Sequence, residues 1–270
     1  MAPSAIQHAP DPATVSVALV QLASDEDEPP QDRVERALAL SSHAASSAGF
    51  VILPELWLAG AFDVHGSGRL AQPLDGPLVQ QFQELAARSQ TWIHMGSIAE
   101  REDGLTFNTS VLINAQGKVL CTYRKLHLFG FEGGELEVMT AGEELVVATT
   151  PAGRTGLATC YDLRFPEQFR SLVDLGATAF FLASGWPAER IEHWRILLKA
   201  RAIENQAWMI ACNGVGTQCG TKLGGRSAVI DPLGHVIAEA GTEEEVLFAQ
   251  VNPSAATTWR TEFPTLRDRR

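Results

Sequence analysis

Three residues with reactive side chains, Glu55, Lys125 and Cys160, each follow an apolar run that is typical of a buried strand. Lys125 comes 70 residues after Glu55, and Cys160 comes 35 residues after Lys125. A carboxylate can take and return a proton, an ammonium group can stabilise an oxyanion, and a thiol can form a covalent intermediate. Together these three residue types favour amide hydrolysis by a cysteine nucleophile.

Cys160 stands where a strand pattern ends and a helix pattern begins, within the segment TCYDLRFPE. A thiol at such a junction faces backbone N–H groups and the positive end of a helix dipole, which favour a thiolate and stabilise an oxyanion. The alternative is a buried structural cysteine. We keep that interpretation for Cys121 and Cys212, which lie inside apolar strands, and for Cys219, which lies in a glycine-rich loop.

Glu55 and Lys125 each have a plain alternative interpretation as solvated charges. Glu55 directly follows Pro54, which ends strand pairing, so we expect its carboxylate at a sheet edge or cleft. A partly desolvated carboxylate has a raised pKa and can serve first as base and then as acid. Taken alone, Glu55 fits a surface loop and Lys125 an exposed strand end, so the interpretation depends on the combination with Cys160.

The apolar periodicity predicts strands that alternate with helices and include hairpins, so we expect mixed α/β sheets covered on both faces. The expected strands span 15–23, 50–56, 91–99, 108–114, 117–124, 145–150, 154–160, 178–184, 207–213, a hairpin over 225–241, and 245–251. The expected helices span 30–48, 77–89, 166–175 and 192–206. Residues 1–14 favour a flexible leader, and 15–270 favour a single domain.

Composition excludes several classes of partner. The chain has 270 residues, 45% of them hydrophobic, and a net charge of −11, which argues against binding nucleic acid or an anionic membrane. Neither a membrane span nor a secretion signal is evident, so we expect a cytoplasmic protein with reduced thiols. No CxxC, HxH or HExxH pattern occurs, and the sequence gives no reason to expect a metal.

Five segments, LPELW, YRKLHLF, GLATCYDLRFPE, ARAIENQ and GRSAVIDPLG, resemble the nitrilase superfamily of carbon–nitrogen hydrolases. The resemblance implies a four-layer α-β-β-α sandwich with Glu55, Lys125 and Cys160 in a cleft. It implies that Glu55 is the general base and acid, that Cys160 attacks the amide carbon, and that Lys125 and the Tyr161 N–H hold the oxyanion. It implies no metal or organic cofactor.

The family also has a second glutamate between the lysine and the cysteine, and this sequence offers Glu132, Glu135 and Glu137. We choose Glu135, which precedes Thr140-Ala141-Gly142 much as the family's residue does, and expect it to orient Lys125 and the substrate amide. The alternative is a solvated acidic residue in a loop.

The residues after Cys160 indicate the branch. Nitrile-cleaving members usually carry Trp-Glu there, whereas YDLRFP resembles amidases that act on ω-amides of 2-oxo acids and on deaminated glutathione. Three positions depart from the ω-amidase pattern, at Gly130, at 213–215 and at 56–58. These departures concern which amide is the substrate, because Glu55, Lys125 and Cys160 are all present. The alternatives to a small-molecule amidase are a nitrilase and a non-catalytic binding member of the fold.

Several further side chains are candidates for the substrate pocket. Arg164 has the geometry to clamp a substrate carboxylate, or else pairs with Asp162 or Glu167 at a helix start. Besides Tyr161, the other candidates are Asp63, His127, Trp186 and Trp194, with packing the simpler role for the two tryptophans.

The C-terminal segment predicts self-association. Trp259, Phe263 and Leu266 are apolar and have few obvious partners in their own chain. Together with the family resemblance, they favour a homodimer or a higher homo-oligomer, in which a two-fold axis would bury the same patch on both subunits.

Overall fold

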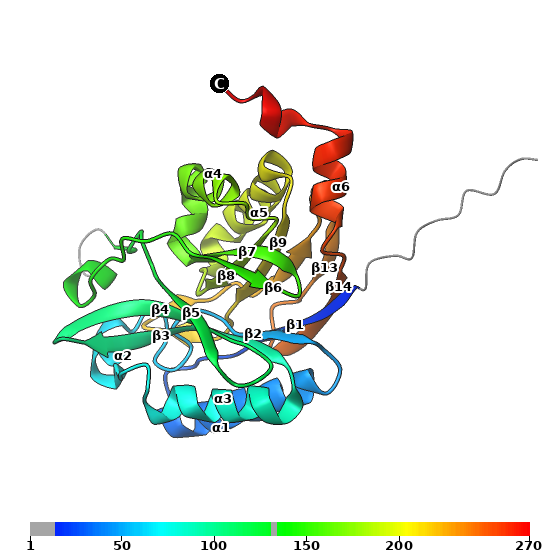
Figure 1. Ribbon diagram of the computed structural model, residues 1–270. Coiled ribbons are helices and arrows are strands. Elements are labelled where there is room, and N and C mark those ends of the chain that lie inside the picture. The colour runs from blue at the N-terminus through cyan, green and yellow to red at the C-terminus, as the bar shows by residue number, and fades with distance from the viewer. Residues whose placement is uncertain (1–13, 131–133) are drawn as a thin grey trace, which may run out of the picture.

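Two mixed sheets lie face to face between two layers of helices, which gives the expected four-layer α-β-β-α sandwich of the α/β class (Figure 1). The computed structural model describes residues 14–130 and 134–270. Most of the expected leader and the candidate Glu132 lie outside the described residues.

Each sheet, within the described part of the chain, has six strands, and its centre is a set of three parallel strands. The first sheet has the order β14-β1-β2-β3-β4-β5, with strands Glu245–Val251, Val15–Gln21, Phe50–Ile52, Trp92–Glu102, Leu105–Ile113 and Val119–Arg124. The second has the order β13-β12-β9-β8-β7-β6, with strands Val236–Glu239, Ala228–Ile230, Trp208–Asn213, Ala179–Ser184, Gly153–Thr159 and Val147–Thr150. A separate short ribbon pairs β10 (Thr217–Gln218) with β11 (Thr221–Lys222).

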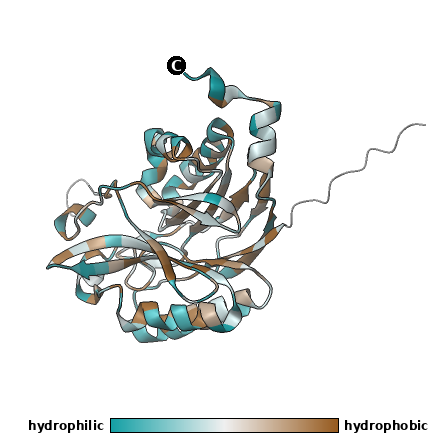
Figure 2. Cartoon of the chain, viewed as in Figure 1, coloured by the Kyte–Doolittle hydropathy of each residue, from teal (hydrophilic) through white to brown (hydrophobic). Residues whose placement is uncertain are grey.

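Helices cover the outer face of each sheet, and three apolar layers hold the sandwich together. The helices are α1 Pro30–Ala45, α2 Val64–Leu70, α3 Pro77–Ser89, α4 Pro166–Asp174, α5 Ile191–Asn205 and α6 Ala255–Glu262. Apolar side chains of α1 and α3 pack on the first sheet, those of α4 and α5 pack on the second, and the middle layer joins the two sheets. Figure 2 shows the same division, with hydrophobic strands inside and hydrophilic residues on the outer helices.

The expected strands and long helices are confirmed, with local differences in length. Strand β2 ends at Ile52, earlier than expected, because Pro54 has no N–H to extend the ladder. The sequence pattern did not predict α2 or α6. Helix α2 has only seven residues, two of them glycine, and it depends on the Asp63 side chain, which accepts a hydrogen bond from the Gly66 N–H at 2.7 Å.

The strand directions bring the three reactive residues to one region. Strand β5 is antiparallel to β4, which is antiparallel to β3, so β5 ends at the same edge of the first sheet as β2. Glu55 follows β2 and Lys125 follows β5 at that edge, while Cys160 follows β7 of the second sheet. Side chains at the carboxyl ends of parallel strands commonly form the ligand site in α/β folds.

His94 of β3 is a fully buried imidazole in the layer between the sheets. Its Nδ1 accepts the Gly96 N–H at 3.2 Å, so its proton lies on Nε2, which has no hydrogen-bond partner among the described residues. The ring packs edge to face against Phe181 at 5.9 Å. Burial lowers the pKa of His94 to about 4, from an ordinary value near 6.5.

We predict that His94 makes folding more sensitive to mild acid. As the pH falls, the unfolded chain takes up the proton before the folded chain does. The contribution of His94 to the free energy of unfolding is therefore complete above about pH 6.5 and is lost as the pH falls toward 4. Between pH 7 and pH 5 the loss should be about 2 kcal/mol for this one group. Urea unfolding of the wild type and of His94→Gln measures it, since glutamine does not titrate.

Both proteins share every other titrating group, so the difference between their pH slopes isolates His94. Equal slopes for the wild type and His94→Gln between pH 7 and pH 5 would contradict a buried neutral imidazole at this position.

Candidate active site

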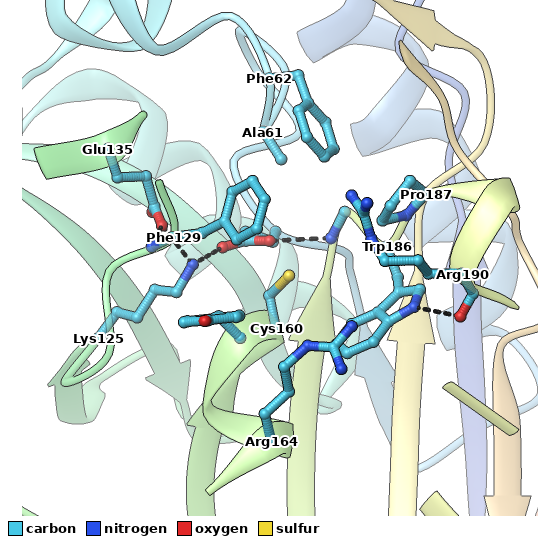
Figure 3. A pocket seen from close by; sticks show the side chains of 13 residues that line it. Ala61, Phe62, Lys125, Phe129, Glu135, Cys160, Arg164, Trp186, Pro187 and Arg190 are labelled. Atoms are coloured by element: carbon cyan, nitrogen blue, oxygen red, sulfur yellow. Dashed lines mark hydrogen bonds and ion pairs between the residues drawn. The ribbon is translucent and has the colours of Figure 1, made fainter. Parts of the chain in front are cut away.

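Lys125 lies between two buried carboxylates and joins them. Its Nζ donates to Glu55 Oε1 at 2.7 Å and to Glu135 Oε2 at 2.6 Å. All three side chains are no more than 3% exposed. Asn108 of β4 closes the cluster, because its Nδ2 donates to Glu55 Oε1 at 2.9 Å and to Glu135 Oε1 at 2.6 Å. Figure 3 shows Lys125 reaching toward Glu135.

The loop after β2 holds Glu55 in place through backbone contacts to both sheets. The Gly185 N–H, just after β8, donates to Glu55 Oε2 at 2.9 Å. A β-carbon at Gly185 would lie 2.4 Å from that of Ala61, so only glycine fits there. A β-carbon at Gly96 would lie 1.8 Å from the carbonyl oxygen of Pro54, so the loop packs against β3 because residue 96 is glycine.

Glu135 is held by main-chain contacts of its own. It opens the short 3₁₀ helix η1 (Glu135–Glu137), and its Oε2 accepts the N–H of Phe129 at 2.6 Å. The Glu135 N–H donates in turn to the carbonyl of Phe129 at 2.8 Å. These paired bonds hold the backbone of Phe129 against Glu135.

Cys160 stands at a sharp turn from β7 into the 3₁₀ helix η2 (Cys160–Arg164). Its φ of 46° lies in the left-handed region, which L residues other than glycine rarely adopt. A capping box stabilises the turn, because the Asp162 carboxylate accepts the Thr159 N–H at 2.8 Å while the Thr159 side chain contacts the backbone of Asp162. The turn aims the thiol away from its own strand and into the cavity (Figure 3).

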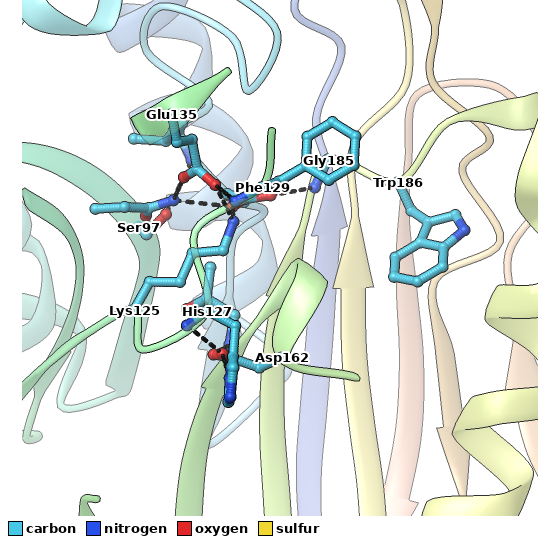
Figure 4. Close-up of polar contacts among 12 residues, drawn as sticks. Ser97, Lys125, His127, Phe129, Glu135, Asp162, Gly185 and Trp186 are labelled. Atoms are coloured by element: carbon cyan, nitrogen blue, oxygen red, sulfur yellow. Dashed lines mark hydrogen bonds and ion pairs between the residues drawn. The ribbon is translucent and has the colours of Figure 1, made fainter. Parts of the chain in front are cut away.

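Asp162 is fully buried and connects the Cys160 turn to β5, the strand that Lys125 follows. It accepts hydrogen bonds from the Tyr123 hydroxyl at 2.6 Å and from the His127 N–H at 3.1 Å, and it contacts His127 Nδ1 at 2.8 Å. Figure 4 shows this contact beside Lys125. Asp162 therefore fixes the segment with the nucleophile candidate relative to the segment with the lysine.

The cluster raises the pKa of both its thiol and its amine, which keeps the thiol neutral and the amine charged. Burial and the Glu55 carboxylate raise the pKa of the Cys160 thiol well above its usual value, and Lys125 offsets this in part. Burial opposes the charge of Lys125, but Glu135 and Glu55 outweigh it and raise the pKa of the ammonium group. Burial and Glu55 raise the pKa of Glu135, against the attraction of Lys125. The resting thiol is thus protonated and needs a base, and Glu55 is beside it.

A cavity that is partly open to solvent contains the cluster. It is lined by Glu55, Ala61, Phe62, Lys125, Phe129, Glu135, Cys160, Tyr161, Arg164, Gly185, Trp186, Pro187 and Arg190. The guanidinium groups of Arg164 and Arg190 both extend into it beside Trp186 (Figure 3). The first lies 4.7 Å over the Trp186 ring and the second 6.0 Å from the Phe129 ring centroid.

The structure brings together the main residues expected from sequence, which are Glu55, Lys125, Cys160, Glu135, Tyr161, Arg164 and Trp186. The alternative Glu137 lies outside this group, is about half exposed and faces His65 at 3.8 Å. Arg164 forms no ion pair with Asp162, Glu167 or any other described residue. Asp63, His127 and Trp194 have structural contacts instead and do not line the cavity.

Sequence reasoning missed three contributors, Asn108, Gly185 and Arg190. A polar residue in the apolar run of β4 was the available signal for Asn108, which is fully buried. Gly185 contributes a backbone N–H, and Arg190 comes from the 3₁₀ helix η3 (Ala188–Arg190), so neither shows a pattern in one sequence.

No described helix is long and apolar enough to cross a membrane.

Comparison with known proteins places these features in a family. Residues 16–261 match the model of the carbon–nitrogen hydrolase family. A 2-oxoglutaramate amidase of Paenarthrobacter nicotinovorans is 38% identical over 270 residues, which cover 97% of this chain and 92% of that protein. A deaminated glutathione amidase of Yersinia enterocolitica is 32% identical over 267 residues, which cover 94% and 93%.

A solved structure agrees with the sequence comparisons. A CN-hydrolase superfamily protein of Xanthomonas campestris, with an arsenic adduct in its active site, matches with a TM-score of 0.87 and 30% identity. The match covers 96% of this chain and 98% of that one. The chain therefore belongs to the carbon–nitrogen hydrolase family, in the amidase branch of the nitrilase superfamily.

Proposed function

We propose that this carbon–nitrogen hydrolase converts a small amide to a carboxylic acid and ammonia through a thioester on Cys160, with Glu55, Lys125 and Cys160 as the catalytic triad. The observation that carries the proposal is the contact of one buried ammonium group with two carboxylates in the cavity that holds the thiol. No step needs a group from outside the chain other than the amide and water.

The first half of the reaction forms the thioester. Glu55 takes the proton of the Cys160 thiol, and the sulfur attacks the amide carbon. Lys125 and the Tyr161 N–H stabilise the oxyanion of the tetrahedral intermediate. Glu55 then gives its proton to the amide nitrogen, the C–N bond breaks, and ammonia leaves.

The second half restores the enzyme. A water molecule gives a proton to Glu55 and attacks the thioester carbon, which again forms an oxyanion held by Lys125 and the Tyr161 N–H. The C–S bond then breaks, the acid leaves, and the proton returns to the sulfur. Hydrogen bonds from Asn108 and to Glu135 hold the side chains of Lys125 and Glu55 in position. Neither Glu135 nor Asn108 exchanges protons with the substrate in this scheme.

We predict that Cys160→Ala lowers kcat by more than about a thousandfold and leaves the fold intact, because it removes the covalent route but little volume. Steady-state release of ammonia from an amide substrate measures the effect. The matched control is Cys219→Ala, an exposed thiol outside the cavity, which should keep wild-type activity. A Cys160→Ala enzyme with more than a tenth of wild-type kcat would refute this nucleophile.

For the substrate we propose an amide whose far end carries a carboxylate. The cavity holds two guanidinium groups, and Arg164 has no described acidic partner, while Arg190 contacts its neighbour Glu189 at 2.5 Å. The names of two relatives, 2-oxoglutaramate amidase and deaminated glutathione amidase, are consistent with such a substrate. Arg164 binds the carboxylate, and the Arg164 guanidinium is stabilised by a cation–π contact with the Trp186 ring.

Arg164→Lys keeps the charge but loses the planar fork that binds a carboxylate in bidentate fashion. We expect kcat/KM for an ω-amide of a dicarboxylic acid to fall by a factor of about ten to a hundred. The methyl ester of the same compound is neutral and should lose much less. Measuring both substrates with both enzymes tests the assignment.

If Arg164 only supports the turn after Cys160, both substrates lose equally and the melting temperature falls. Parallel losses would therefore remove Arg164 from the substrate site and leave the acidic-substrate proposal without support.

Two further proposals concern organisation and location. We treat residues 15–270 as one catalytic domain, in keeping with the family match over 16–261.

All four cysteines are free, which suits a reducing compartment. We therefore place the protein in the cytoplasm, and cell fractionation would test this location.

We also propose that the chain forms a homodimer or a higher homo-oligomer. Trp259 and Phe263 stack on each other at 5.3 Å at the C-terminal end of α6, and the Phe263 side chain is 52% exposed. Burial of this pair against a second copy removes apolar surface from water. We predict a mass in light scattering above the 29.2 kDa of one chain. A mass of one chain at all micromolar concentrations would contradict the proposal.

A further inference from the structure

Ser184, the last residue of β8, lies beside Cys160. Strands β7 and β8 are parallel neighbours with Thr159 opposite Ala183, so the next residue on each strand, Cys160 and Ser184, comes side by side at the same edge. The backbone of Ser184 is fixed there, because its carbonyl accepts the Gly214 N–H at 3.0 Å and the Glu55 N–H at 3.4 Å.

The side-chain hydroxyl of Ser184 is fully buried and has no hydrogen-bond partner among the described residues. A buried polar group without a partner is costly, and each such group in a folded protein calls for an explanation. Burial and Glu55 raise the pKa of the Cys160 thiol, whereas Lys125 and a hydrogen bond from Ser184 to the charged sulfur lower it. The hydroxyl thus stabilises the charged sulfur and forms no hydrogen bond with any other described group.

We propose that Ser184 is a further catalytic residue, whose hydroxyl donates a hydrogen bond to the Cys160 sulfur when the thiol has lost its proton. This inference rests on the proposed role of Cys160 as nucleophile. The hydroxyl is unpaired while the sulfur is neutral and becomes paired when the sulfur carries charge.

Such a contact favours the charged states of the reaction over the resting state. The sulfur is charged before it attacks the amide and again as it leaves the thioester carbon. An interaction that is stronger in those states than in the resting enzyme lowers the barrier, whereas one present equally in all states does not. A Ser184 hydroxyl that has no partner in the resting site and binds the charged sulfur is therefore what this role requires.

The test measures the pH dependence of Cys160 alkylation by iodoacetamide, with peptide mapping to separate it from the other thiols. In Ser184→Ala the thiol pKa should be about one unit higher, so the rising limb of the alkylation profile should move to higher pH. At neutral pH the rate should fall about threefold, because tenfold less thiolate is partly offset by its greater nucleophilicity. kcat should fall as well, and Ser184→Thr, which keeps the hydroxyl, should restore both values.

Ser41→Ala is the matched control. Ser41 is likewise a fully buried serine whose hydroxyl has no partner among the described residues, but it lies on α1, outside the cavity. It should change neither the alkylation profile nor kcat. If Ser184→Ala has the wild-type profile, or loses activity without a shift of the profile, the role of Ser184 is refuted while Cys160 stands. If wild-type Cys160 is not alkylated at all, the nucleophile assignment fails, and the Ser184 inference fails with it.

Discussion

The buried contact of Lys125 with Glu55 and Glu135 is the interaction on which the rest of the site depends. Removing charges from water is expensive, and an ion pair in the interior is tolerated only when its remaining donors and acceptors are satisfied. Here Asn108, the Gly185 N–H and the Phe129 N–H supply those contacts. Loss of one partner would leave a buried charge uncompensated, so the geometry of the cluster and the stability of the strand ends around it are coupled.

The mixed sheets provide the positions that this cluster requires. The antiparallel hairpins at one side of the first sheet return β5 to the edge where β2 ends, which carries Lys125 to Glu55. Face-to-face packing through the middle apolar layer then presents the ends of β7 and β8 to the same edge. A purely antiparallel pair of strands would have sent Cys160 and Ser184 to opposite ends of the sheet.

Asp162 connects the two halves of the site and also stabilises the turn at Cys160. Its carboxylate accepts hydrogen bonds from the Thr159 N–H at the start of η2 and from the Tyr123 hydroxyl of β5. These two contacts hold the backbone of Cys160 at its positive φ. Strain at one backbone position persists only where the surroundings over-determine it. Burial of a neutral thiol beside the Glu55 carboxylate follows from the same packing. In the mechanism we propose, this burial is the reason that the thiol needs a base and that a donor near the sulfur matters.

The sequence by itself determined the class of fold, the reactive residues at strand ends and the family, because strand periodicity and the segments around Glu55, Lys125 and Cys160 are local patterns. Among Glu132, Glu135 and Glu137 it favoured Glu135 only through the family resemblance, since spacing along a loop does not tell which side chain turns inward. Only the tertiary structure placed Glu135 on Lys125 and brought Asn108, Gly185, Arg190 and Ser184 to the site. Their contributions depend on strand register and on a backbone N–H, which are long-range properties that a single sequence does not display.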